Sequence, residues 1–399
     1  MPDMPTGQLI RLYRIDRKKS TVNVATHAGI TARYLEMIEA GTKTPSLPVL
    51  RQLAKVLGVR TSALLGESPS EDHEGPVNLT LAKLERALFT YDSVPLESSA
   101  GEPEELAARI QAASDAWFTS KNAYTEVLTV LPSLVVETEQ AVKESGQSPG
   151  TCDLAYSLYR LTRGVLKHAG RIDLCALAAD RAMRYAHATE NSLTLAAASW
   201  TLGQTILSND MPHGAFEVSM MCAERLEPSL VDGTPEHFSV YGGLIQCAAI
   251  ASTRIGDPWR ARELLRDKAM PAAERIGDGQ NHQNIFFGPT NVGIHAAAAV
   301  ALEAGDVSET VRLADNVDIS KVASMERRCS HLYQIAKAYE YKGNDTAVFV
   351  HLKMAEGFRP QDFQYKRQVR GMVNALVKRA KPSYASEVRE FAARIGLLN

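Results

Sequence analysis

The sequence lacks the cysteine patterns of disulfide-stapled and metal-binding proteins. Its 399 residues include five cysteines, an odd and widely spaced set without a C-x-x-C pair. We therefore expect free, buried thiols rather than disulfides or a metal site. The five are Cys152, Cys175, Cys222, Cys247 and Cys329.

Long hydrophobic runs are also missing. The longest apolar stretches, such as LAAAS and HAAAAVALEA, are rich in alanine. They are much shorter than the ~18 residues that indicate a membrane-spanning helix. The chain does not open with an apolar leader either. We therefore expect a cytoplasmic protein with no membrane partner.

Familiar catalytic motifs are absent as well. The sequence contains no H-E-x-x-H and no G-x-S-x-G, and the segments GTKT and GVRTS lack the other glycines of a phosphate-binding loop. Several histidines lie far apart, without the spacing of paired metal ligands. We expect no catalytic residue, no cofactor and no bound metal, and hence a protein that is not an enzyme. These histidines are His27, His168, His187, His213 and His295.

Charge is distributed unevenly along the chain. Residues 1–66 hold ten Lys or Arg and four Asp or Glu, whereas the remaining residues hold 34 and 42, so the two parts carry +6 and -8. The length exceeds the ~100 to 200 residues of one domain. A basic module on an acidic body favours a polyanionic partner for the first segment. Charge alone leaves open a merely solvated basic face.

Composition marks the domain boundary. Gly66–Val77 reads GESPSEDHEGPV, a polar segment without apolar periodicity that is typical of a linker. A second break runs from Ser93 to Pro103, and Pro103 suits the first turn of a helix. Helical patterning follows to the end, with no strand pattern. The sequence predicts an all-α protein with a module at residues 1–66, a linker at 67–77 and a second module at 78–399.

Apolar spacing predicts five short helices between residues 7 and 65. Ser20, Thr31 and Ser46 are placed to cap the second, third and fourth helices, because each hydroxyl can accept free amides of a first turn. Gly29 and Gly41 follow helices where left-handed turns are expected.

The buried faces of these helices follow from the same spacing. We expect Val22, Val24 and Ala25 to form the core face of the second helix, and Leu35 and Ile38 that of the third. The outward face of the third helix then holds Ala32, Arg33, Glu36 and Met37. Such a face can reach base edges in the major groove, where arginine suits guanine. Lys43, beyond the helix, is placed for a phosphate.

Residues 7–65, from GQLIRLYR to VRTSALL, resemble the Xre/Cro-type (lambda-repressor-like) helix-turn-helix domain along their full length. The resemblance implies binding to a double-stranded DNA operator, and it places Glu39 at the family's internal glutamate position. Thr21 replaces the usual glutamine, and Lys19 replaces an apolar residue. The implied DNA-binding residues are Ser20, Thr21, Thr31, Ala32, Arg33, Tyr34, Glu36, Met37 and Lys43.

The second module contains a recurrence of turns. They fall at Gly170, Asp210, Gly256, Gly305 and Gly343, and the fifth residue beyond each is small or of modest size. This pattern resembles tetratricopeptide (TPR) repeats, stacked helix pairs that form a solenoid, although the spacing exceeds the ~34 residues of that repeat. Arg163 departs from the pattern, since a small residue is expected there. The small residues are Cys175, Ala215, Ala261, Thr310 and Val348.

In such repeats the first helix of each pair lines a concave groove. Amides there could pair with the backbone of an extended peptide, and Arg or Lys with a carboxylate. Trp200 could instead belong to the core, and Arg160 or Lys337 could be solvated. The loop before His295, with Phe286 and Phe287, could be a binding edge or a plug of the core. The ligand-binding residues predicted from the repeat register are Arg160, Trp200, Gln204, Gln246, Asn291, His295, Tyr333 and Lys337.

The two modules together resemble the peptide-binding regulators of Gram-positive bacteria (the RRNPP class) and similar actinobacterial regulators. The resemblance implies a homodimeric transcription factor whose TPR-like, α-solenoid domain senses a peptide or a small molecule. Two alternatives remain at this point: the solenoid docks another protein, or it only dimerises and the protein is a constitutive repressor without a ligand.

Overall fold

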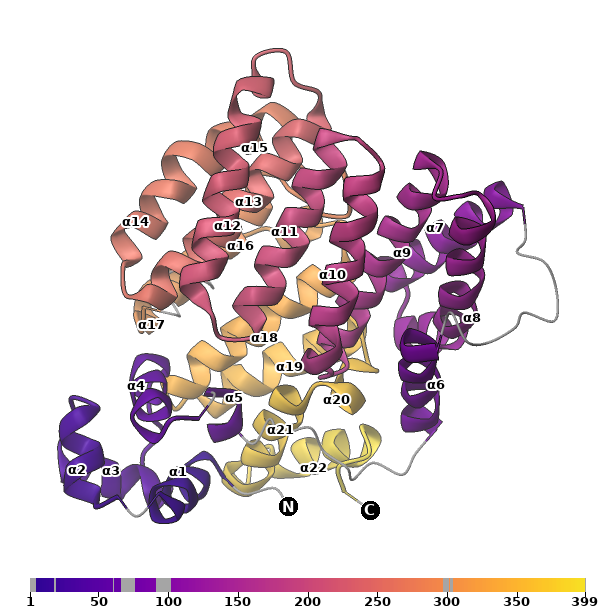
Figure 1. The fold of residues 1–399 in the computed structure, drawn as a ribbon. Coiled ribbons are helices and arrows are strands. Elements are labelled where there is room, and N and C mark those ends of the chain that lie inside the picture. Colours follow the sequence, from indigo (N-terminus) through magenta and orange to yellow (C-terminus); the bar gives the residue numbers. More distant parts are fainter. Residues whose placement is uncertain are drawn as a thin grey trace.

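The computed structural model describes residues 5–17, 19–59, 61–65, 76–90, 102–296, 301 and 304–398. In these ranges the chain is helical and contains no strand (Figure 1), which confirms the all-α prediction. Most of the predicted linker and of the second break, residues 67–75 and 93–101, lies outside the described residues. None of the described helices has both the length and the apolar character to cross a bilayer.

The first module contains the five predicted helices around one apolar core. Ser20 Oγ accepts from the Asn23 amide at 3.1 Å, and Thr31 Oγ1 accepts from the Tyr34 amide at 3.2 Å, as predicted. Gly29 and Gly41 both have positive φ, at 69° and 75°. The helices are α1 Thr6–Asp16, α2 Thr21–His27, α3 Ala32–Glu39, α4 Leu47–Leu57 and α5 Thr61–Leu64.

Two local predictions for this module are wrong. Val22 is 64% exposed, because it lies two residues from Val24 and therefore on nearly the opposite side of α2. Ser46 precedes α4 but makes no side-chain capping bond. Pro48, in the first turn, has no amide hydrogen to donate and so removes one of the groups that a cap can bind.

Helices α1 and α3 cross very closely. A Cβ atom at Gly7 would lie 1.9 Å from the carbonyl oxygen of Ile38, so only glycine fits this crossing. Arg14 on α1 also binds Glu39 through two bonds of 2.7 Å, and both side chains are largely buried. Glu39, predicted to be an internal glutamate, therefore forms an ion pair with Arg14 that joins α3 to α1.

The second module is a TPR-like α-solenoid. All five predicted turn residues have positive φ, between 60° at Asp210 and 107° at Gly256. The residue five positions beyond each turn is at most 1% exposed, so paired helices do pack against these small side chains. Its first helices are α6 Pro76–Thr90, α7 Pro103–Thr119, α8 Ala123–Glu144, α9 Pro149–His168, α10 Ile172–Ala188, α11 Ser192–Ser208, α12 Pro212–Leu226 and α13 Pro235–Ile255.

All five cysteines are free thiols. Four of them are buried and Cys222 is half-buried.

Short helices, including 3-10 and π-helical turns, follow α13 and lead to the longer helices α18 and α19. The remaining elements are η1 Glu227–Leu230, α14 Pro258–Glu263, the π-helical η2 Leu264–Ala269, α15 Met270–Ile276, α16 Pro289–His295, α17 Val307–Ala314, η4 Ile319–Lys321, α18 Met325–Tyr341, α19 Asp345–Phe358, α20 Asp362–Tyr365, α21 Arg367–Arg379 and α22 Ala385–Arg394.

The two ends of the solenoid meet. In Figure 1 the helices α18–α22 run beneath α10–α13 and reach the side of α7 and α8. There Arg359 Nη1 donates to the Trp117 carbonyl at 2.6 Å, and the Tyr124 and Tyr365 rings stack with centroids 3.9 Å apart. Gln361 Oε1 accepts from the Tyr124 amide at 2.9 Å. These contacts curl the solenoid into a closed turn with an interior cavity.

Candidate functional site

Helix α3 presents the predicted DNA-reading face. Arg33 and Glu36 are exposed, and Met37 is half-buried. Ala32 and Tyr34 are half-buried because they also pack against the core of the first module. The exposed arginine in the first turn of α3 can therefore reach a base edge, while Ala32 and Tyr34 chiefly fix the helix beside it.

The two flanks of this face are also defined. Ser20 is exposed at the start of α2, Thr21 is half-buried, and Thr31 is exposed at the start of α3. After α3, the Met37 carbonyl accepts from the amides of Thr42 and Lys43 at 2.9 and 3.1 Å. This turn holds Lys43 in an exposed position next to the reading helix.

The departure at Lys19 has a structural reason. Its ammonium group donates to the Val56 carbonyl near the end of α4. The Lys19 carbonyl in turn accepts from Arg14 Nη1 at 3.2 Å. A polar residue at this position therefore joins α1 and α4, where the family usually places an apolar contact.

The first module packs against the mouth of the solenoid. Thr61 Oγ1 on α5 donates to Asp210 Oδ2, in the turn between α11 and α12, at 3.0 Å. A cavity of about 1850 Å³ lies between the domain and the solenoid interior. Ile38 of α3 lies in its wall, together with Ala40, Gly41 and Lys43 of the turn after this helix. The cavity is larger than the ~300 to 1,000 Å³ of common ligand sites.

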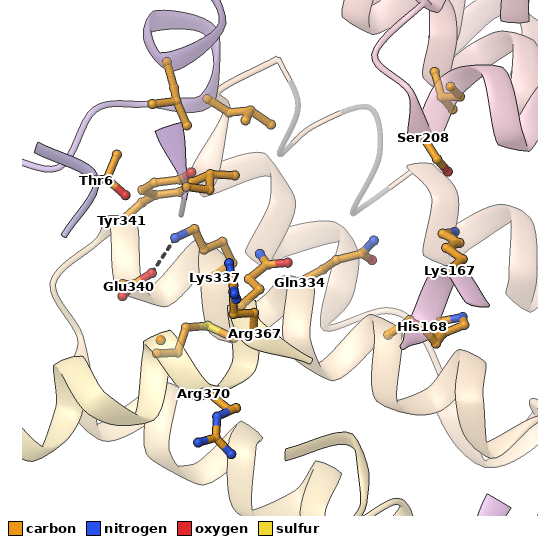
Figure 2. Close-up of a pocket in the computed structure, with 18 of the residues that line it drawn as sticks. Thr6, Lys167, His168, Ser208, Gln334, Lys337, Glu340, Tyr341, Arg367 and Arg370 are labelled. Atoms are coloured by element: carbon orange, nitrogen blue, oxygen red, sulfur yellow. Dashed lines mark hydrogen bonds and ion pairs between the residues drawn. The ribbon is translucent and has the colours of Figure 1, made fainter. Parts of the chain in front are cut away.

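Five of the eight predicted ligand residues line this cavity. They come from four helices, α9, α11, α16 and α18, which the turn register correctly directs inward. Trp200 also packs on the adjacent core, and Lys337 is paired with Glu340 at 2.7 Å (Figure 2). The five are Arg160, Trp200, Gln204, His295 and Lys337.

The other three predicted residues do not line the cavity. Gln246 is 2% exposed and donates to Asn291 Oδ1 at 3.0 Å, and Asn291 donates onward to the Phe286 carbonyl at 2.8 Å. Tyr333 is buried and donates to Asp362 at 3.1 Å, next to the contacts that close the solenoid. The prediction that these three side chains point into the groove is wrong, because they face neighbouring helices or a loop.

The loop at residues 277–288 crosses the solenoid interior and is held by side chains. Arg160 Nη1 donates to the Gln283 carbonyl, and Arg327 Nη2 donates to the Ile285 carbonyl at 2.9 Å. Phe287 sits over Gly242, where a Cβ atom would lie 1.9 Å from its ring. Phe287 therefore plugs the core, and Arg160 supports the loop as well as lining the cavity.

The inner part of the cavity is cationic. Burial and the neighbouring Arg163 lower the pKa of Lys167 to about 8. Burial and Lys366 lower the pKa of His168 to about 4, and burial and Arg327 lower that of His295 to about 3. Both histidines are therefore neutral at pH 7. The positive charge here comes from Lys167, Arg163 and Arg327.

Sequence reasoning missed several cationic residues of the cavity. Arg163 and Lys167 lie one helical turn apart on α9, and the misfit of Arg163 with the repeat pattern was the available signal. Arg327 on α18 and the residues contributed by α21 had no signal in the repeat register, because they come together only when the solenoid closes. The missed cations are Arg163, Arg254, Arg327, Arg367, Arg370, Lys378 and Arg379.

Comparison with known proteins supports the first domain directly. A helix-turn-helix domain family matches residues 6–66. The immunity repressor protein of Bacillus phage phi105 is 28% identical over 145 residues, which cover 35% of this chain and 92% of the repressor. The HTH-type transcriptional regulator SinR of Bacillus subtilis (strain 168) is 33% identical over 85 residues, 21% of this chain and 77% of SinR. The chain belongs to the helix-turn-helix family of transcriptional regulators.

Two solved structures were also found, both at low TM-score. Bacillus thuringiensis PlcR, in complex with the peptide PapR7 and DNA, has 11% identity and a TM-score of 0.29, over 78% of this chain and 94% of PlcR. The apo competence regulator ComR of Streptococcus vestibularis has 14% identity and a TM-score of 0.16, over 98% of both chains. The match to helix-turn-helix regulators identifies this chain as a DNA-binding transcriptional regulator. Its TPR-like solenoid is seen in its own helices. In the described residues, no group of three or more His, Cys, Asp or Glu side chains is arranged to hold a metal ion.

Proposed function

We propose that this regulator binds a peptide or a small ligand in its central cavity, and that binding changes the placement of the DNA-binding domain. The observation that carries the proposal is the composition of the cavity wall. The end of the reading helix lines it together with α9, α11 and α18 of the solenoid. A ligand there would touch both domains, and it would shift their arrangement to the extent that it prefers one.

The proposed division of the chain follows from its cores. Residues 1–66 would form the DNA-binding domain, residues 67–77 a linker and residues 78–399 the sensing domain. The first domain has its own core, from Ile10 to Leu64. Leu84 and Leu88 of α6 join the solenoid core instead, which supports a boundary before α6.

The proposed DNA contacts are the nine residues implied by the family resemblance. Arg33 would read a base, Ser20, Thr31 and Lys43 would contact phosphates, and the half-buried residues would shape the surface. One reading helix covers few base pairs. We therefore infer a homodimer that places two such helices about 34 Å apart on one face of DNA. Sedimentation of the full chain at micromolar concentration tests this inference, and a monomer that remains monomeric on DNA would contradict it.

Thermal unfolding of the full chain with fractionated cell extract tests the sensing proposal. A dialysable ligand that binds the folded protein should raise the melting temperature in proportion to its concentration. Stabilisation by the high-molecular-weight fraction alone would instead indicate that the solenoid docks another protein. No effect of either fraction would favour a constitutive regulator. Sequencing the DNA bound in cells would supply the operator for the binding assays.

A further inference from the structure

The charge of the cavity is opposite to the charge of the domain that forms it. Residues 67–399 carry 34 Lys or Arg and 42 Asp or Glu. Among the described residues of this part that line the cavity, however, ten are Lys or Arg and two are Glu, and Lys43 of the first domain adds one more cation. The acidic surplus therefore lies elsewhere, and the cavity concentrates positive potential that attracts anions.

Two cations of the cavity wall, Lys167 and Arg163, have donor groups without a direct partner in the described part of the protein. Lys167 lines the cavity, and its ammonium group makes no hydrogen bond or ion pair with any described residue. Arg163, one turn earlier on α9, is 6% exposed and donates to Thr205 through Nε at 2.9 Å. Its Nη2 is shielded from solvent and has no hydrogen-bond partner among the residues that the structure describes. A buried donor without a partner is costly, so such a group marks a site that a ligand can complete.

The surroundings of Lys167 favour an anion further. Arg163 and Arg327 act on it as like charges, and Glu326 is the carboxylate that opposes them. Glu326 is itself occupied, since it lies 3.1 Å from His168 Nε2. Figure 2 shows Lys167 and His168 on one side of an open space, with Gln334, Lys337 and Arg367 on the other.

From this arrangement we infer that the cavity is built for an anionic ligand, whose carboxylate or phosphate group binds Lys167 and the free side of Arg163. The inference rests on the proposed sensing function and adds the chemical class of the ligand. A carboxylate or phosphate oxygen matches both the ammonium group and the flat guanidinium, with short charge-assisted bonds. Neutral or cationic molecules would leave the like charges uncompensated.

Two simple anions can test this site in the full-length protein. Sodium citrate supplies carboxylates and sodium pyrophosphate supplies phosphates, each at ionic strength held constant with sodium chloride. The variants are Lys167→Met, Lys167→Arg and the control Lys121→Met, since Lys121 is exposed in the turn before α8. The measurement is the melting temperature as a function of anion concentration.

We expect a saturable rise in melting temperature with at least one anion. The rise should be the same in Lys121→Met, largely kept in Lys167→Arg and mostly lost in Lys167→Met. The anion that gives the larger shift identifies a carboxylate or a phosphate site. A linear rise that is equal in all four proteins is the general stabilising effect of these salts, and it would overturn the inference. No rise with either anion would overturn it as well.

The sensing proposal and the anion site can fail separately. If a dialysable extract fraction changes operator binding but the active material passes through an anion exchanger and neither anion binds, the sensor stands and the anion site falls. If pyrophosphate or citrate binds in a Lys167-dependent way but no fraction alters operator binding, the anion site stands and the sensing proposal falls.

Discussion

The fold disfavours the charged form of the Lys167 side chain. Its pKa is lowered from 10.5 to about 8 by burial and by the like charges of Arg163 and Arg327, which outweigh Glu326 and Cys175. At pH 7 the folded protein therefore keeps a proton there at a cost. The unfolded chain holds this proton up to the ordinary pKa, so the cost disappears as pH rises from about 8 to 10.5.

The pH dependence of Lys167→Met tests this state. Below pH 8 the variant should be more stable than wild type, because it lacks the repulsion. The difference should shrink between pH 8 and 10.5, as wild type becomes more stable relative to the variant. Urea unfolding of wild type, Lys167→Met and the exposed control Lys121→Met at several pH values measures it. A stability difference between wild type and Lys167→Met that stays constant with pH would show that the pKa of Lys167 is not lowered in the folded protein.

Arg33 and Lys43 should differ in what they recognise. Arg33 projects from the first turn of the reading helix, so Arg33→Ala should lose ~1 to 3 kcal/mol on the operator and relax the preference at one base position. Lys43 lies in the turn beyond the helix, so Lys43→Ala should weaken operator and random DNA alike. Gel-shift titrations on both DNAs at one salt concentration compare them. If Arg33→Ala lowers the affinity for operator and random DNA equally, Arg33 does not contact a base.

At the scale of helices, local chemistry predicted much of the fold. Ser20, Thr31 and the turn glycines were readable because a cap or a left-handed turn depends on the chain within a few residues. Ser46 failed because Pro48 changes the donors available in the same turn. The buried partners Gln246 and Asn291 could not be placed, since their contacts depend on a loop that crosses the solenoid. The spacing of apolar residues predicts which face of a helix is buried, but not which element packs against that face.

Gly7 should be irreplaceable at the crossing of α1 and α3. A Cβ there would meet the Ile38 carbonyl oxygen at 1.9 Å, a backbone atom that cannot rotate away. Gly7→Ala should therefore push α1 from α3, destabilise the first domain by several kcal/mol and weaken operator binding. Gly357→Ala, where an added Cβ meets nothing within 4 Å, is the matched control on α19. Thermal unfolding and operator binding of both variants measure the effect, and identical behaviour would refute the close crossing.

At the scale of the whole molecule, the closed turn of the solenoid creates the cavity. Arg359 is 1% exposed, and it binds the Trp117 carbonyl and lies 3.3 Å from Asp362. Its removal leaves a buried carboxylate with fewer partners and separates the two ends. The cationic residues of α21 face the cavity only because these ends meet, which is why sequence patterns did not reveal them.

Arg359→Ala should open this closure. We expect a loss of ~3 to 5 kcal/mol in the free energy of unfolding, together with a larger radius of gyration in solution scattering. Arg394→Ala serves as the control, since Arg394 is 54% exposed and pairs with Glu356 on the surface. That control should lose at most ~1 kcal/mol. If both variants lose equally little, the ends of the solenoid are held by other contacts.

Two glutamines allow the most direct test of the coupling between the cavity and DNA. Gln204 lines the cavity, whereas Gln246 is buried beside Asn291 and does not. The measurement is operator affinity of the full chain with and without the dialysable extract fraction, for wild type, Gln204→Ala and Gln246→Ala. Gln246→Ala should cost ~1 to 3 kcal/mol of stability, because Asn291 loses its partner.

We predict that the fraction changes the operator affinity of wild type and of Gln246→Ala by the same factor, and the operator affinity of Gln204→Ala by a much smaller factor. All three proteins should bind the operator equally well without the fraction, since neither glutamine belongs to the DNA-reading face. An equal response of wild type and Gln204→Ala would contradict a ligand in this cavity. A wild-type protein that does not respond at all would contradict the coupling itself.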